Sequence, residues 1–153
     1  MKNLIYILLL AVLTITSCKN EPSKEEIALQ KQIEAYDLLM TEAMEVHDQI
    51  MPKMGELMEL KGELVASKEE AELSDDQLMK LDATAANLKV SHDGMMDWMV
   101  DYSEKFPYGE PSPETKADLD KKMPVLEQEV VEIKELRDHT MTAIANAKEI
   151  LAN

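Results

Sequence analysis

Apolar residues recur at alternating intervals of three and four along most of the chain, the spacing of one face of an α-helix. The first stripe contains Leu29, Ile33, Tyr36, Met40, Ala43, His47, Ile50, Met54, Leu57 and Leu64. The second contains Leu78, Leu81, Ala85, Leu88, His92, Met95, Met99, Tyr102 and Phe106. The third contains Leu119, Met123, Leu126, Val130, Ile133, Leu136, Thr140, Ala143, Ala147 and Ile150. No stretch alternates with period two, so we predict an all-α fold without a sheet.

Capping residues set the bounds of three predicted helices, at about residues 23–71, 74–105 and 113–152. Capping boxes start the first two helices, at Ser23 with Glu26 and at Ser74 with Gln77. The loop over residues 105–113 is rich in proline, and Ser112 with Pro113 is expected to start the third helix. Because short connections make sequential helices antiparallel neighbours, we expect an elongated, coiled-coil-like antiparallel three-helix bundle.

The first 17 residues have a different pattern. Lys2 is followed by an apolar run from Leu4 to Leu13, which is typical of a secretory signal peptide and too short for a permanent membrane span. The segment from Ile15 to Cys18 resembles the lipobox of bacterial lipoproteins, with an aliphatic residue three positions before the cysteine and small residues between them. The resemblance implies cleavage before Cys18 and attachment of diacylglycerol to its sulfur.

The expected organisation is therefore a signal peptide (1–17), a lipidated tether (18–22) and the bundle (23–153). The protein would contact the membrane through its N-terminal lipid, in the bacterial cell envelope. Lys19 stands where enteric-type lipoproteins of the inner membrane carry aspartate, so the resemblance favours the outer membrane and leaves its periplasmic or surface face open. Cys18 is the only cysteine, so the mature chain can form no internal disulfide.

The charge of the chain narrows the classes of partner. Asp and Glu number 31 against 16 Lys and Arg, a formal net charge of −15, and Arg137 is the only arginine. Nucleic-acid binding needs clustered Lys and Arg, so we exclude nucleic acid as a partner. The acidic residues fall mostly at outward helical positions, where they are expected to form a solvated surface.

One short pattern, His-Asp-x-apolar-Met-x-x-Met, occurs twice, starting at His47 and at His92. Its His and two Met positions share one helical face. Imidazole and thioether ligands without cysteine suit soft ions such as Cu(I) or Ag(I). The candidate ligands are His47, Met51, Met54, His92, Met95, Met96 and Met99. Two other interpretations stay open: the methionines simply pack the core, or a His/Met pair holds haem, against which the low aromatic content counts.

The register of the helices determines which of these residues meet. A first turn centred near residue 73 would place His47 opposite Met99, whereas a turn near 70 would place the two histidines opposite each other. A second turn near 109 would bring Met123 level with Met95 and leave His139 far away. Pro52 and Pro124 are expected to interrupt their helices, and Gly94 to weaken the second helix at the same level.

No nucleotide-binding loop, zinc-protease motif or nucleophile elbow occurs, so we expect no enzyme activity. With its lipobox and its H-D-x-x-M-P-K-M and H-D-x-M-M-x-W-M segments, the chain resembles small helical lipoproteins of Bacteroidota-type bacteria that are labelled "viral A-type inclusion protein". That label implies a location and a fold, without a mechanism. The expected function is a non-catalytic binding or scaffolding role, with an envelope protein as a possible partner and the oligomeric state open. The alternatives are binding of a soft metal ion and an acidic envelope spacer.

Overall fold

The computed structural model describes residues 22–70 and 72–152, so Cys18 and the predicted signal peptide lie outside the described residues. The regular structure in the described part is entirely helical: α1 (Lys24–Ile50), the 3-10 turn η1 (Met51–Lys53), α2 (Met54–Glu70), α3 (Asp75–Lys105) and α4 (Lys116–Leu151). The predicted all-α helical bundle is confirmed. Within the described ranges, no helix has the length and apolar character that a membrane span requires.

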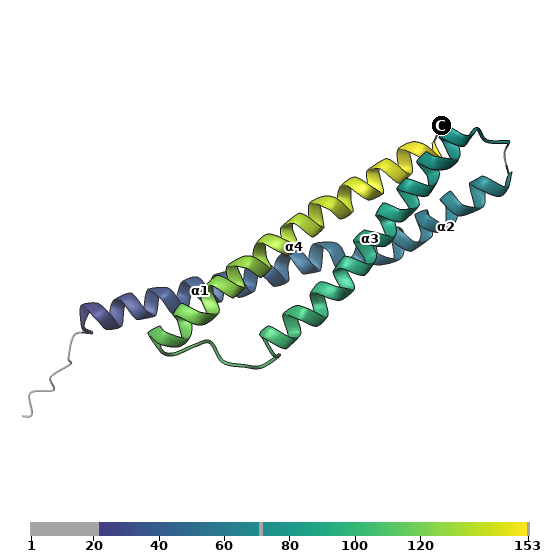
Figure 1. Cartoon of the computed structure of the whole chain (residues 1–153). Helices are drawn as coiled ribbons and strands as arrows, with labels where there is room; N and C mark the ends of the chain where they lie inside the picture. The colour runs from purple at the N-terminus through teal and green to yellow at the C-terminus, as the bar shows by residue number, and fades with distance from the viewer. Residues whose placement is uncertain (1–21, 71, 153) are drawn as a thin grey trace, which may run out of the picture.

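The helices form an elongated bundle (Figure 1). α1, η1 and α2 follow one another as one long arm, and α3 returns antiparallel to it. α4 then runs parallel to α1. α1 packs against α4, α2 packs against α3, and α3 packs against α4. The start of α1 and the end of α4 therefore lie at opposite ends of the molecule.

The capping boxes and the first proline behave as predicted. The Ser23 hydroxyl accepts a hydrogen bond from the Glu26 backbone N–H, and the Glu26 carboxylate accepts one from the Ser23 N–H. Ser74 and Gln77 make the equivalent pair at the start of α3. Pro52 interrupts the first helical arm, because η1 replaces the α-helix over Met51–Lys53.

Two predictions about the third helix are wrong. α4 starts at Lys116, later than the predicted 113, with Thr115 as its N-cap. The Ser112 hydroxyl donates to the Asp37 carboxylate on α1 and caps no helix, while Pro113 is buried. Pro124 does not interrupt α4, which continues through it.

The register of α4 against α3 also differs from the prediction. Leu136 packs over Gly94, and the Ser91 hydroxyl lies 2.9 Å from His139 Nδ1, so His139 is close to the His92 level. Met123 lies more than three helical turns before Leu136 and is not level with Met95. The cause is the connection after α3, which runs on past the end of that helix before α4 begins (Figure 1).

The core has two parts that differ in composition. The first core cluster joins α1, the second half of α3 and the first half of α4, and it holds every buried aromatic side chain among the described residues: Tyr36, Trp98, Tyr102 and Phe106. The second core cluster joins α2, the first half of α3 and the second half of α4, and it is aliphatic. Met54 packs against both clusters and marks the boundary between them.

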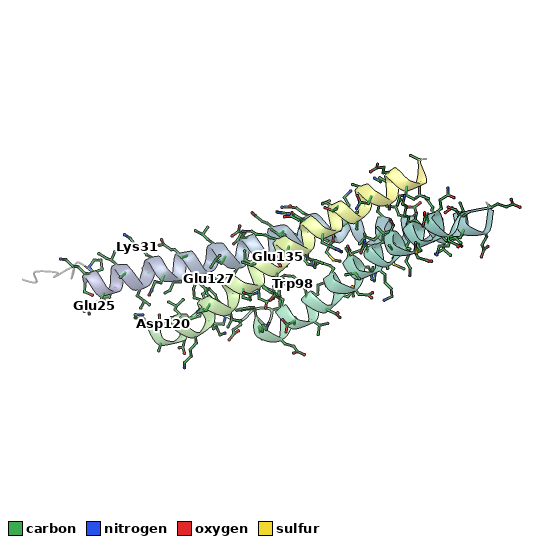
Figure 2. The ribbon with its side chains drawn as sticks, turned by 45° about the horizontal axis from the view of Figure 1, so that its top comes forward. Glu25, Lys31, Trp98, Asp120, Glu127 and Glu135 are labelled. Atoms are coloured by element: carbon green, nitrogen blue, oxygen red, sulfur yellow. The ribbon has the colours of Figure 1, made fainter. Side chains whose placement is uncertain are left out.

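Charged side chains cover the outside of the bundle, as the sequence predicts. Figure 2 shows Glu25, Lys31, Asp120, Glu127 and Glu135 projecting from their helices, and all five are exposed.

The glycines in α2 and α3 are expected to respond differently to alanine. A Cβ at Gly62 would meet nothing within 4 Å, whereas a Cβ at Gly94 would lie 3.1 Å from Leu136 Cδ1. Gly62→Ala should therefore raise the free energy of unfolding by about 0.5–1 kcal/mol through better helix propensity. Gly94→Ala should raise the free energy of unfolding by less, because Leu136 has to move. Urea unfolding of both variants tests this, and an equal gain at the two positions would contradict the close approach of α3 and α4.

Candidate functional site

Each copy of the histidine–methionine pattern places one side chain fully in the core. Ile50 and Met95, which occupy the same place in the pattern, are both fully buried. The side chains of His47 and His92 are 15% and 30% exposed, and their Nδ1 atoms lie 2.9 Å and 3.3 Å from the carboxylates of Asp48 and Asp93. The histidines therefore sit at the edge of the core, not within its stripe.

The position of His47 agrees with a first turn centred near residue 73. Its ring centroid lies 6.1 Å from that of Trp98, the residue before Met99. The alternative register, in which the two histidines oppose each other, does not fit this contact.

The methionines of the pattern differ in how deeply they are buried. Met51, Met54 and Met99 are half-buried against the first core cluster. Met95 is fully buried, whereas Met96 is 46% exposed, because adjacent helical residues point about 100° apart. Met96 therefore points away from Met95, and binding of a soft ion by the remaining residues stays a prediction.

Large side chains fill the junction between α1 and α3. Trp98 stacks on Tyr102 with ring centroids 4.6 Å apart, and Tyr102 lies 5.1 Å from Phe106. The Tyr102 hydroxyl donates to the sulfur of Met40 on α1, at 3.3 Å. Burial raises the pKa of Tyr102 to about 12, with smaller contributions from Tyr36 and Glu129, so its hydroxyl keeps the proton that it donates.

A buried carboxylate lies beside these rings. Glu129 on α4 is completely buried, and its Oε1 accepts a hydrogen bond from the Lys105 Nζ at 2.6 Å. Hydrogen bonds to Asp101 first, and then to Glu129, raise the pKa of Lys105 above its usual range, so the ammonium stays charged. The ion pair supplies a counter-charge for one oxygen of Glu129.

Two buried polar atoms at this point have no hydrogen-bond partner among the described residues. They are the second oxygen of Glu129, Oε2, and the indole nitrogen of Trp98, Nε1. Leaving a buried polar group unpaired costs about 1–3 kcal/mol, and more for a charged group. Native proteins rarely retain such groups without an ion, a water or a functional role.

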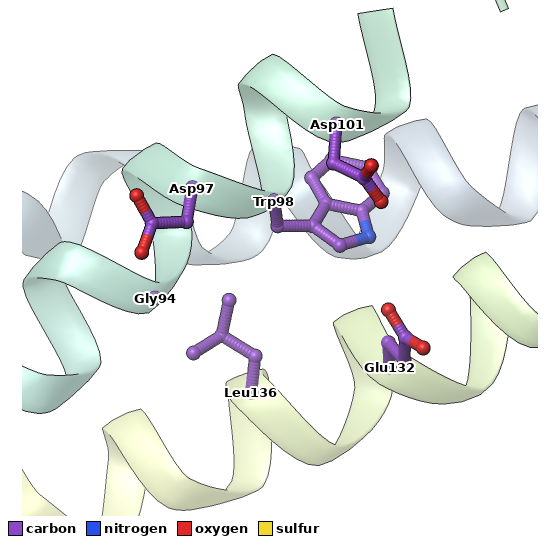
Figure 3. A pocket seen from close by; sticks show the side chains of 6 residues that line it. All are labelled: Gly94, Asp97, Trp98, Asp101, Glu132 and Leu136. Atoms are coloured by element: carbon purple, nitrogen blue, oxygen red, sulfur yellow. The ribbon is translucent and has the colours of Figure 1, made fainter. Parts of the chain in front are cut away.

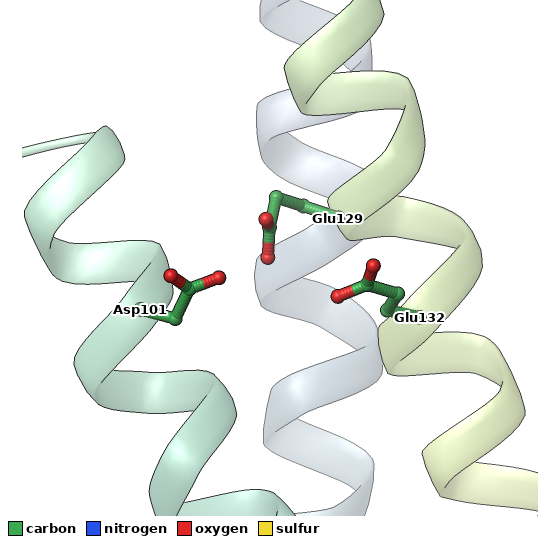
Figure 4. Close-up of side chains that lie close together, drawn as sticks. All are labelled: Asp101, Glu129 and Glu132. Carbon is green, nitrogen blue, oxygen red and sulfur yellow. The ribbon is translucent and has the colours of Figure 1, made fainter.

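An open pocket of about 380 Å³ lies on the same side of α3 and α4 (Figure 3), lined by Gly94, Asp97, Trp98, Asp101, Glu132 and Leu136. Carboxylate oxygens of Asp101, Glu129 and Glu132 lie within 4.8 Å of one another at its edge. Figure 4 shows the three carboxylates turned towards a common point between α3 and α4. We call these three residues the acidic centre. Its oxygen ligands suit hard cations, unlike the ligands of the histidine–methionine pattern.

Glu129 was not among the residues predicted from the sequence, although its position in the helical pattern is a signal for it. Glu129 follows Leu126 by three residues and precedes Ile133 by four, so it occupies a core position of the third stripe. A carboxylate at such a position is the informative exception in a chain whose other acidic residues lie mostly outside.

The structure brings one serine and one histidine together without forming a catalytic pair. The Ser91 hydroxyl donates to the Asn87 carbonyl and lies 2.9 Å from His139 Nδ1. Ser91 is fully buried, so a substrate cannot reach its oxygen. The contact is a structural link between α3 and α4.

Comparisons with known protein families, with curated proteins and with solved structures found no match for this chain.

Proposed function

We propose that the protein is a lipid-anchored, non-catalytic binding or scaffolding protein of the bacterial cell envelope. The observation that carries the proposal is the lipobox-like segment that ends at Cys18, immediately before the start of the bundle. Diacylglycerol on Cys18 would hold the protein at the membrane, and Lys19 favours the outer membrane.

The position of the first helix supports this arrangement. α1 is capped at Ser23 and begins at Lys24, so the tether from Cys18 to the bundle is short. α4 begins near the same end of the molecule, while the α2–α3 connection and the end of α4 lie at the other (Figure 1). The arm from Lys24 to Glu70 spans roughly 70 Å at 1.5 Å per residue. A bundle of that length would carry its far end well away from the lipid.

A binding role fits the surface features better than catalysis does. A pocket of about 510 Å³ lies at the far end, and its lining is half apolar and half polar: Leu73, Leu81, Ile150 and Leu151 with Ser67, Gln77, Lys80 and Glu149. The Ser91–His139 contact is closed to substrates. Envelope proteins that meet either the far end or the acidic sides are the class of partner that this arrangement suits.

Cys18→Ala is the variant that tests the anchor. In cells fed a labelled fatty acid, we expect the wild-type protein to incorporate label and to enter the detergent phase. Cys18→Ala should incorporate none, because it lacks the sulfur that receives the lipid, and it should accumulate as the larger precursor.

Ser17→Ala is the matched control, because alanine is also small and keeps the lipobox-like pattern. It should be labelled like the wild type. Equal labelling of Cys18→Ala and wild type would overturn the proposal.

A further inference from the structure

We propose that the acidic centre binds a hydrated divalent cation of the calcium class. The proposal goes beyond the lipid anchor and does not depend on it. It stands on three observations: the convergence of Asp101, Glu129 and Glu132, the unpartnered Glu129 Oε2, and the unpartnered Trp98 Nε1 in the wall of the adjacent pocket.

The local charge is matched to a divalent ion. The three carboxylates carry three negative charges, and Lys105 neutralises one through its contacts with Asp101 and Glu129. Two negative charges remain in a partly desolvated position between two helices. A cation with two positive charges would balance them, and it would give Glu129 Oε2 the partner that no described residue supplies.

The spacing of the carboxylates suits one shared cation. Their oxygens lie within 4.8 Å of one another, and two oxygens bound to the same Ca²⁺ at 2.3–2.6 Å are at most about 4.6–5.2 Å apart. Ca²⁺ also accepts irregular geometry, which suits carboxylates on two different helices, whereas Mg²⁺ requires a near-ideal octahedron. Glu129 and Glu132 project from one face of α4, three residues apart, and Asp101 faces them from α3 (Figure 4).

The indole group supports the presence of bound water. Trp98 is 7% exposed, and its Nε1–H donates to no described residue. Figure 3 shows the indole nitrogen on the edge of the ring that faces Asp101 and Glu132. Three carboxylates do not complete the six to eight ligands that Ca²⁺ takes, so the ion keeps waters. One of those waters can accept the hydrogen bond from Trp98, and a single hydrated ion then satisfies both unpartnered atoms.

The site is open to ions from solution. Glu129 is closed off, but Asp101 is half-buried and Glu132 is exposed, so an ion enters through the pocket beside Trp98. Because Glu132 is exposed and its Oε1 also accepts a hydrogen bond from Gln128, we expect a modest dissociation constant for Ca²⁺ of about 10⁻⁴–10⁻³ M, as in extracellular calcium modules. The bound ion would tie α3 to α4 next to the aromatic part of the core.

Terbium luminescence tests the site directly, because Trp98 is the only tryptophan and lines the pocket. With the full mature protein purified in detergent, excitation of Trp98 should sensitise Tb³⁺ luminescence that saturates at one ion per chain and is reversed by Ca²⁺. Glu129→Gln and Glu132→Gln should each weaken Tb³⁺ binding at least tenfold. Glu132 is exposed, so its variant keeps the fold even if Glu129→Gln does not, and circular dichroism checks both.

A matched control separates the site from the acidic surface. Glu135→Gln removes one exposed charge from the same helix, outside the acidic centre. It should bind Tb³⁺ with an affinity within about twofold of the wild type. The proposal is overturned if Glu132→Gln binds like the wild type, if Glu135→Gln weakens binding equally, or if Ca²⁺ fails to displace Tb³⁺.

Discussion

Trp98→Ala is expected to lower the free energy of unfolding by about 3–5 kcal/mol, the range for truncating a large buried aromatic side chain. Trp98 is 7% exposed, stacks on Tyr102 and contacts the His47 ring. It therefore joins α1 to α3 at the level where large side chains fill the space between these helices. Alanine would leave a cavity between these helices that the surrounding backbone cannot close. Urea unfolding, followed by far-UV circular dichroism, measures the loss.

Trp98→Phe and Val100→Ala are the controls for this effect. Phenylalanine keeps a ring against Tyr102 and removes the unpartnered indole N–H, so the expected loss is under about 1.5 kcal/mol. Val100 lies on the same helix but is 59% exposed, and its truncation should change stability by less than about 0.5 kcal/mol. If Trp98→Ala lowers the free energy of unfolding no more than Val100→Ala does, Trp98 does not join α1 to α3 as the structure indicates.

Lys105→Met is expected to destabilise the protein by about 2–3 kcal/mol in the presence of a chelator. The variant leaves the fully buried Glu129 carboxylate without its ammonium partner, and an unpaired buried charge costs several kcal/mol. The Lys105 side chain is 38% exposed, so solvent screening places the effect below that of a completely buried pair. Methionine keeps most of the apolar stem, which isolates the loss of the charge.

A double variant distinguishes loss of this ion pair from general damage. Adding Glu129→Gln to Lys105→Met removes the charge that needed a partner, so much of the lost stability should return. The coupling between the two substitutions is read from the four unfolding curves of the cycle. If the double variant is less stable than Lys105→Met alone, the Lys105 ammonium does not stabilise the buried charge of Glu129, and the prediction is contradicted.

Local signals in the sequence predicted the helices well. The capping boxes at Ser23 and Ser74 depend on residues three positions apart, so the sequence alone contains both partners. The start of α4 was predicted wrongly, because the cap was expected at Ser112. The Ser112 hydroxyl binds Asp37, a partner far away in the sequence that no local pattern reveals, and Thr115 caps the helix instead.

The candidate site was harder to predict, because it depends on how the helices are placed. A stripe that is defined by apolar residues leaves out Glu129. The predicted stripe also contained Met99 in place of Trp98, although Trp98 fits the spacing from Met95 to Tyr102 equally well. The extended connection after α3 shifts α4 by about three turns relative to the predicted register, and this shift places Glu129 beside Lys105 and Asp101. The number of residues in the connection does not show in which direction it runs, so this register could not be predicted from the sequence.

The most direct test of the lipid anchor is the intact mass of the protein extracted from membranes. We predict a chain that begins at Cys18, heavier than its polypeptide by a diacylglycerol group and any acyl chain on the new N-terminus, with residues 1–17 removed. A chain that retains residues 1–17, or one that begins at Cys18 without lipid mass, would contradict the account.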